Sequence, residues 1–424
     1  MKTRKRCYSW IAFLLILAML PITAFATGTD GAEPAAPATV TVYLSMSHDA
    51  AFLQPSASDA VMALRKLEVP YFDLGLYGLE NFYFSSETYG DDGDGEPGSA
   101  LDPGTQEFAK DKITMMHLFI YATEVFYCGI KPEDAGTGLL ATTGMLGTNI
   151  MSITGSVGSS YLSNFWGMDE NLNYYLNYQY PLASPGWGAT SDQILLEDGD
   201  IVTLGHFSDW NFYKDPASVF NYIKAGEDTV TTTAVQGEQV SMTAYRAGAN
   251  MGAPGSKSLD QGDYTTAHTP LTSCPEVYYV AVEDLSRGDV EDPEAWTHIA
   301  TADSSGSFTV DTSKMEPGEY LICIPGQYGV RETLKEPMIC STPGGIILTV
   351  EEPQIMYGDV NGDGEVSSLD AALTYAVHNG KYVFTQAQQQ AADVNGDGEV
   401  SSLDAALIYA VHNGKLQIFP VETP

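Results

Sequence analysis

The sequence predicts a multidomain chain in which an α+β domain and an all-β sandwich precede a small all-helical module. Three observations carry this prediction. The chain contains 25 Tyr and 41 Gly, and short runs of alternating apolar residues recur before the last quarter. A segment near the C-terminus occurs twice, at residues 358–381 and 392–415. A single short apolar stretch stands at the N-terminus.

Residues 1–26 have the pattern of a secretory signal. Basic residues open the chain, an apolar run follows at residues 10–20, and Ala24-Phe25-Ala26 forms a small-x-small cleavage site. The run is shorter than the roughly 20 residues that a membrane helix needs. We therefore expect cleavage, secretion and no membrane span in the mature chain. An uncleaved membrane anchor is the alternative.

The charge balance excludes some partners. The chain has 19 basic and 55 acidic residues, a net charge of −36, which disfavours nucleic acids and anionic membranes and favours cation binding. Four cysteines follow the signal, and no pair has the spacing of a metal site. Free buried thiols are favoured, and a Cys323–Cys340 bridge is the alternative.

Residues 27–38 are expected to be a flexible leader and residues 39–226 an α+β domain. Val40, Val42, Leu44 and Met46 alternate as in a half-buried strand. Helices are predicted at residues 58–67 and 105–128, and Asp198-Gly199-Asp200 is expected to turn between two strands.

The segments NYYLNYQYP and GWGATSDQILLEDGDIV resemble a β-grasp-like domain of secreted bacterial proteins, distantly related to the C-terminal domain of transcobalamin. The resemblance implies a helical insertion, and ligand binding or adhesion.

Residues 227–352 are expected to form the sandwich. Alternating segments at 239–245, 277–282, 307–310 and 346–350 predict short strands. The segments GSFTVD and PGEY resemble bacterial immunoglobulin-like surface domains, which implies a spacer or adhesive role.

Each copy of the repeat contains D-x-N-x-D-G-x-V-S-S-x-D. Alternate side chains of such a loop can surround calcium with oxygens while the Gly permits the sharp turn. The spacing predicts two calcium ions, one per loop. The expected ligands are Asp359, Asn361, Asp363, Glu365 through its carbonyl, Ser367 through water, Asp370, Asp393, Asn395, Asp397, Glu399 through its carbonyl, Ser401 through water, and Asp404. Two solvated polar turns are the alternative.

A helix is predicted after each loop. Leu369, Ala372, Leu373, Ala376 and Val377 recur at helical spacing, and the second copy repeats them. We expect the two stripes to pack against each other, antiparallel, in one small core. Each helix is expected to end at an Asn-Gly pair. No lead-in helix is expected before the loops, because a proline precedes the first. Tyr357 and Phe419 are expected to clasp the ends.

This duplication of a loop and a helix, closed by Asp, resembles the type I dockerin over residues 357–418. The resemblance implies calcium-dependent docking onto a cohesin of a scaffoldin or cell-surface protein, in either of two orientations. The family's partner-reading positions fall on Ser368, Leu369, Tyr375, Ala376, Ser402, Leu403, Tyr409 and Ala410. The best-known members carry basic residues where this chain has Tyr-Ala.

No catalytic motif is present in the sequence. The expected function is therefore docking of a secreted protein in a cellulosome-like or cell-surface complex, with a glycan or other small ligand for the N-terminal domain. The alternatives are a divergent O-glycosyl hydrolase and a purely structural calcium module. The aromatic residues considered for sugar stacking are Phe165, Trp166, Tyr174, Tyr175, Tyr178, Tyr180, Trp187, Trp210 and Tyr213. Core packing is the other explanation for them.

Overall fold

The computed structural model describes residues 38–55, 59–80, 82, 112–142, 150–156, 159–168, 171–184, 187–208, 219–249, 266–285, 296–331, 336–353 and 355–422. The predicted signal and residues 27–37 of the predicted leader lie outside these residues, as do Trp210 and Tyr213. No helix in the described part of the chain is long and apolar enough to cross a membrane.

The first sheet is mixed, and its centre is β1 (Thr39–His48). β1 runs parallel to β9 (Asp200–Phe207) and antiparallel to β2 (Ala51–Phe52) and β3 (Arg65–Pro70). β6 (Asn171–Leu176) is antiparallel to β9. The predicted alternation in β1 is confirmed, because Val42, Leu44 and Met46 are buried on one face.

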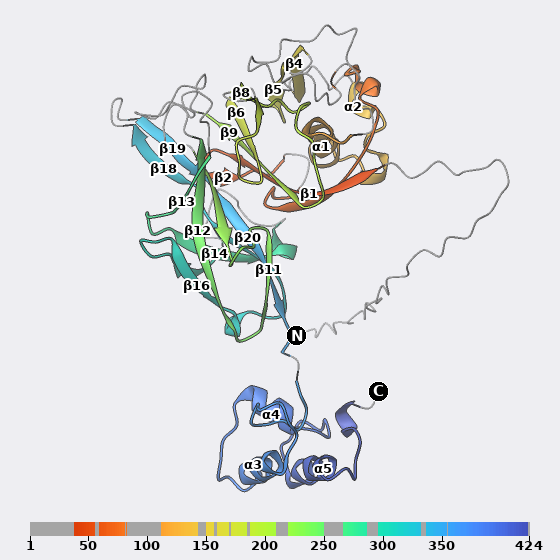
Figure 1. The fold of residues 1–424 in the computed structure, drawn as a ribbon, viewed down its shortest axis with the longest axis vertical. Coiled ribbons are helices and arrows are strands. Elements are labelled where there is room, and N and C mark those ends of the chain that lie inside the picture. Colours follow the sequence, from red (N-terminus) through yellow and green to blue (C-terminus); the bar gives the residue numbers. More distant parts are fainter. Residues whose placement is uncertain are drawn as a thin grey trace, which may run out of the picture. The chain divides into compact units, whose positions relative to one another are not determined.

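The core of this domain lies between the sheet and α1 (Met115–Ala122), whose residues are all buried (Figure 1). α1 continues into the π-helical turn η2 (Thr123–Tyr127). The smaller elements are η1 (Leu74–Tyr77), η3 (Pro132–Asp134), α2 (Leu139–Thr142), β4 (Met151–Ser156), β5 (Ser159–Phe165), β7 (Leu182–Ser184) and β8 (Trp187–Gly188).

Two sequence predictions for this domain are wrong. The described part of 58–67 is not helical: residues 61–64 are buried and irregular, with a bend at 63–64 where Leu64 has φ +45°, and β3 begins at Arg65. Tertiary burial on all sides overrides their helical propensity. The turn at Asp198-Gly199 is present, with Gly199 at φ +92°, but only an isolated bridge at Leu195 precedes it. β9 instead pairs with β1, a strand from the start of the domain.

Two further sheets enclose a second core. One has the order β13 (Thr266–Pro270), β12 (Gln239–Ala249), β10 (Val219–Lys224), β19 (Glu336–Thr342), β18 (Gln327–Arg331), with β16 (Ser307–Asp311) on β12. The other has the order β11 (Thr231–Val235), β20 (Gly344–Glu351), β17 (Gly318–Ile324), β14 (Glu276–Ala281), β15 (Thr297–Thr301). The turns η5 (Val282–Asp284) and η7 (Thr312–Lys314) connect strands.

Strands therefore occur at every segment where the sequence predicted one for the sandwich. Ile322, Ile346 and Leu348 face Met242 and Phe308 across the core between the sheets. β10 pairs with β12, although the predicted boundary at residue 226 placed it in the preceding domain. Cys323 is buried without a disulfide. The β-grasp-like and immunoglobulin-like classes stay predictions.

The C-terminal module contains α3 (Ser368–His378), α4 (Gln386–Ala392), α5 (Ser402–His412) and the short η8 (Pro420–Glu422). α3 and α5 lie side by side (Figure 1). Asn379 and Asn413 end the two helices, each followed by a Gly with positive φ, as the sequence predicted. Two small apolar clusters fill the interior.

Candidate metal centre and docking face

The first repeat forms a tight loop whose acidic side chains accept from backbone N–H groups. Asp359 Oδ1 accepts from Gly362 N at 2.8 Å, and its Oδ2 accepts from Gly364 N at 2.8 Å. Asn361 Nδ2 donates to Asp363 Oδ2 at 2.7 Å. Gly364 has φ +86°, a conformation that L side chains rarely adopt. The loop thus brings the oxygens of Asp359, Asn361 and Asp363 together.

The second loop has the same conformation. Asp393 Oδ1 accepts from Gly396 N at 2.9 Å, and its Oδ2 accepts from Gly398 N at 2.8 Å. Asn395 Nδ2 donates to Asp397 Oδ2 at 3.0 Å. The two copies therefore offer equivalent sets of oxygens.

Asp370 and Asp404 are fully buried and tie each loop together. Asp370 Oδ1 accepts from Val360 N and Asn361 N, both at 3.0 Å. Its Oδ2 accepts from Ser367 N at 2.9 Å and from Ser367 Oγ at 2.7 Å. Asp404 repeats the bonds to Asn395 and Ser401. The carboxylate that ends each loop thus holds the start of the loop against the start of the helix.

The serines that precede the helices act as N-caps. Ser367 Oγ accepts from Leu369 N at 3.2 Å, and Ser401 Oγ accepts from Leu403 N at 3.1 Å. Glu365 and Glu399 are exposed, and their N–H groups donate to Asp363 and Asp397. Coordination through the Glu carbonyls and through water at the serines stays a prediction.

The donor set of the loops suits a hard divalent cation. Residues 357–418 contain eight acidic and two basic side chains, and the ion pairs recorded among the described residues all lie upstream of them. The described residues include no cluster of three His, Cys, Asp or Glu side chains tight enough to hold a metal. A complete shell therefore needs the Asn amide and Glu carbonyl oxygens as well. Such an all-oxygen, acidic set is what calcium prefers.

The prediction that the apolar stripe of each helix faces the core is wrong, because each helix is rotated by part of a turn from that orientation. α3 buries Asp370, Ala371 and Thr374, whereas Leu369 is 55% exposed. Ala372 is also exposed, and Leu373 and Val377 are half-buried. The helix turns this way because Asp370 must point inward to close the loop.

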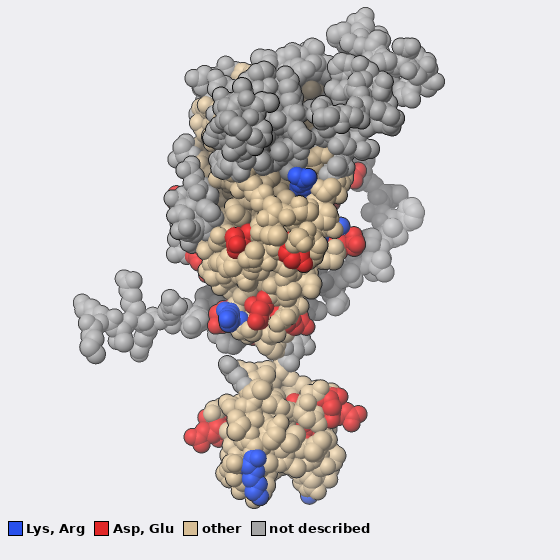
Figure 2. Space-filling model, turned by 90° about the vertical axis from the view of Figure 1, so that its left-hand side faces the viewer, with Lys and Arg blue, Asp and Glu red and all other residues tan. Residues whose placement is uncertain are grey.

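The rotation creates an uncharged outer face on both helices. Leu369 and Tyr375 are each 55% exposed on α3, and Leu403 and Tyr409 are 56% and 52% exposed on α5. Ser368 and Ser402 are exposed beside them, whereas Ala376 and Ala410 are half-buried. Figure 2 shows the charged side chains of this module as separate groups with uncharged surface between them. The eight predicted partner-reading positions thus all lie at least partly on the surface.

α4 was missed by the sequence prediction, which expected no lead-in helix. It ends at Ala392, directly before Asp393, so the second loop does have one. Thr385 caps α4 and forms a capping box with Gln388. The pattern Thr-x-x-Gln at the start of the Gln- and Ala-rich segment 386–392 is visible in the sequence and could have found this helix.

The predicted clasp of the module's ends is present. Phe419 is 3% exposed and packs in one cluster with Tyr357. Gly358 has φ +86°, and a Cβ on it would lie 2.5 Å from Phe419 Cζ. Val421 N donates to Val394 O at 3.1 Å, which joins the same segment to the second loop.

The structure does not support the aromatic residues as a sugar-stacking platform. Phe165, Trp166, Tyr175 and Tyr178 are all less than 5% exposed, and Tyr174 and Tyr180 are half-buried. They form core contacts such as the Phe165–Trp166 stack at 5.5 Å between ring centroids. For the part of the set that the structure describes, core packing is therefore the better explanation.

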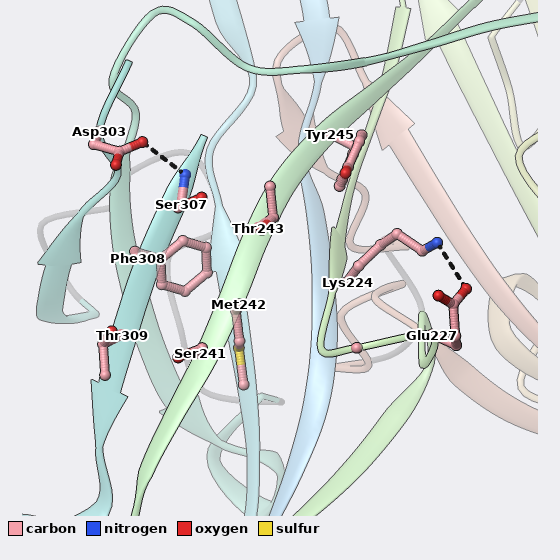
Figure 3. Close-up of a pocket in the computed structure, with 11 residues that line it drawn as sticks. Lys224, Glu227, Ser241, Met242, Thr243, Tyr245, Asp303, Ser307, Phe308 and Thr309 are labelled. Atoms are coloured by element: carbon pink, nitrogen blue, oxygen red, sulfur yellow. Dashed lines mark hydrogen bonds and ion pairs between the residues drawn. The ribbon is translucent and has the colours of Figure 1, made fainter. Parts of the chain in front are cut away.

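A separate groove of about 610 Å³ crosses β10, β12 and β16 of the sandwich (Figure 3). Lys224 Nζ lies 3.4 Å from Glu227 Oε2 at one end, and Asp303 accepts from Ser307 N at the other. Hydrogen bonds from Ser305, followed by the one from Ser307, lower the pKa of Asp303. The groove therefore combines hydroxyl-bearing side chains with one basic and two acidic side chains.

Comparisons with known proteins identify one part of the chain. No curated protein matches it significantly. Two solved complexes of the third cohesin ScaC with a mutated ScaB dockerin, from Acetivibrio cellulolyticus, match with 38% identity. Each match covers 17% of this chain and 100% of that one, with a TM-score of 0.16. Residues 357–410 match the family model of the dockerin type I domain, and this part of the chain is a type I dockerin.

Proposed function

We propose that this protein docks through residues 357–418 onto a cohesin, in a calcium-dependent manner, as a secreted component of a cellulosome-like or cell-surface complex. The observation that carries the proposal is the outward placement of Leu369, Tyr375, Leu403 and Tyr409, each more than half exposed. An isolated small module would gain stability by burying these side chains, and exposed apolar clusters mark interaction sites. The dockerin family match gives the partner class.

Docking in two orientations is supported by where the repeats differ. The copies differ only at Gly358/Ala392 and Thr374/Ile408. All four of these residues are buried, so the outer faces of α3 and α5 have the same residues. A partner that reads α3 finds the same side chains on α5.

Calcium, when bound, would neutralise the loop carboxylates and order the backbone. Asp359, Asn361 and Asp363 would hold it in the first loop, and their equivalents in the second. Asp370 and Asp404 would fix the angle between each loop and its helix. The position of each docking face therefore depends on its loop, because Leu369 and Leu403 lie only two residues after the N-caps Ser367 and Ser401.

The test is binding of the full chain to cohesins of the same genome, with calcium and with EDTA. We expect binding only with calcium. Tyr375→Ala or Tyr409→Ala alone should weaken binding only about twofold, the statistical factor for losing one of two equal sites. Both together should weaken it at least about thirtyfold, as for interface hot spots.

Val383→Ala is the matched control, since Val383 is 86% exposed and lies outside the helices. It should bind as the parent does. A chain that binds no cohesin with calcium contradicts docking. A single Tyr variant that abolishes binding contradicts two orientations, while leaving docking itself intact.

For the upstream domains we propose ligand binding or adhesion. The groove on β10, β12 and β16 offers the side-chain hydroxyls of Ser241, Thr243 and Thr309, for which no side-chain hydrogen bond is recorded within the described residues. These suit a polar, uncharged ligand such as a glycan, and glycan-array binding of the full chain tests this.

The hydrolase alternative gains no support from this groove, because a glycosidase acid needs a raised pKa and that of Asp303 is lowered.

A further inference from the structure

α4 stands between the two loops and touches both. Its last residue, Ala392, precedes Asp393, so the direction of the helix sets where the second loop begins. The same helix also contacts the first loop. Gln388 Nε2 donates to Val360 O at 3.0 Å, and Gly358 N donates to Ala391 O at 2.8 Å. Val360 and Gly358 flank Asp359, so α4 holds the backbone on both sides of the first ligand of the first loop.

The apolar clusters cross between the loops in the same way. Val360 of the first loop and Val400 of the second pack together with Phe384 and Ala392. Val394 of the second loop and Val366 of the first pack together with Ile408 and Phe419. Each loop thus gives one valine to each cluster, and neither cluster is complete unless both loops are in place.

From this arrangement we infer that the two cation sites are thermodynamically coupled through α4, so that filling either loop raises the affinity of the other. The inference rests on the proposed calcium binding. Ordering the second loop fixes Asp393 and the end of α4, which places Ala391 and Gln388 against the first loop. The second cation then meets a loop whose ordering cost is already met, which is positive cooperativity. Gln388 acts as a positioning residue, because it holds Val360 and touches no expected ligand atom.

The test is isothermal titration of the metal-free full chain with calcium. Wild type should bind two ions with a Hill coefficient above 1. Gln388→Met keeps the volume of the side chain but loses both the donor to Val360 O and the oxygen that accepts from Thr385 N, and should bring the Hill coefficient toward 1. Gln390→Met is the matched control, because Gln390 is exposed on the same helix. It should leave the Hill coefficient unchanged. A role for Gln388 in stability alone would lower both affinities equally and keep the cooperativity.

Asp397→Asn provides the second variant, by weakening the second site directly. We expect the affinity of the first site to fall about tenfold, within the usual range of coupling between sites. Gln388→Met added to Asp397→Asn should then have little further effect on cooperativity. A first site that keeps its affinity within twofold in Asp397→Asn overturns the coupling. Wild-type chain that releases no heat with calcium, and shows no calcium-dependent shift in melting temperature, overturns the metal assignment itself.

Discussion

Phe419 is the side chain that most directly closes the dockerin module. Its ring lies on the backbone of Gly358 and is almost fully buried. Removing a buried Phe typically costs about 3 kcal/mol or more. We expect Phe419→Ala to lower the free energy of unfolding of the calcium-sensitive transition by that amount, measured by calorimetry of the full chain. Ile418→Ala, at a position 54% exposed, should change it by less than about 0.5 kcal/mol. Equal losses in the two variants would contradict the clasp.

Two buried histidines make the N-terminal domain sensitive to acid. Burial lowers the pKa of His117 to about 4 and that of His206 to about 3. Thr114 N donates to His117 Nδ1, so the neutral ring has its proton on Nε2, which faces Phe72 O. Neither ring nitrogen of His206 has a hydrogen-bond partner among the described residues.

The unfolded chain takes up protons on these rings below about pH 6.5, whereas the folded domain does not. Stability is therefore full above pH 6.5 and falls as the pH drops toward 4, by up to about 1.4 kcal/mol per unit for each ring. Urea unfolding at pH 7.5 and 4.5 measures this. His206→Met should reduce the loss, and His412→Met, at an exposed position, should not. An unchanged midpoint in the parent chain would contradict the argument.

The loop conformation was predictable from the residue spacing, whereas the roles of these residues as cation ligands stay predictions. The spacing of Asp359, Asn361 and Asp363 predicts a tight loop that gathers their side chains, and the structure shows such a loop. That Asp370 is fully buried and ties Val360 to Ser367 was not visible, because it depends on the tertiary position of the helix. The need for a glycine at position 358 was likewise not visible in the sequence, because it arises from the close approach of the Phe419 ring.

Among the elements, η2 is held by one buried carboxylate. Glu124 is fully buried, and its oxygens accept from Gly136 N at 2.7 Å, Leu140 N at 3.0 Å and Tyr77 Oη at 2.8 Å. Glu124→Ala removes the buried acceptor of these three donors, at about 1 kcal/mol or more each. We expect a loss of at least about 3 kcal/mol in the free energy of unfolding, with faster hydrogen exchange at residues 136–140.

Glu133→Ala serves as the comparison for Glu124→Ala, because its side chain is 69% exposed. It should leave both stability and exchange unchanged. Slow exchange at residues 136–140 in Glu124→Ala would show that this carboxylate does not hold the segment.

Helix periodicity predicted α3 and α5 but not the side that faces inward. The stripe that contains Leu369 and Ala372 is apolar, yet a buried acid outweighs it because Asp370 satisfies four donors at once. In an interaction module, apolar residues are therefore a poor guide to burial. α4 was missed because its glutamines give no apolar stripe.

At the scale of the whole molecule, we expect metal removal to unfold the C-terminal module and to leave the upstream domains folded. Residues 357–418 contain eight acids and two lysines, and their clusters are small. We expect EDTA to remove the helical circular dichroism of α3, α4 and α5, while the strands of the upstream sheets persist. Readdition of calcium should restore the signal. A helical signal that is unchanged in EDTA would contradict coupled folding and binding.

Strand positions upstream were predictable from alternation, whereas strand partners were not. The pairing of β1 with β9 joins residues about 160 positions apart, for example Val42 with Asp200. The alternation of apolar and polar residues within a strand contains no information about which distant strand it pairs with. The same limit explains why the predicted boundary at residue 226 separates β10 from its partner β12.

The contact between Phe419 and Gly358 has a genetic consequence. Near-identical tandem repeats in DNA are prone to be copied over one another. Copying the second repeat onto the first would introduce Gly358→Ala and place a Cβ 2.5 Å from the aromatic ring. Copying in the other direction would introduce Ala392→Gly at the end of α4, at a cost of about 1 kcal/mol. At this pair of positions the second repeat therefore cannot replace the first without a clash against Phe419, whereas the reverse replacement changes only the helix propensity of one residue.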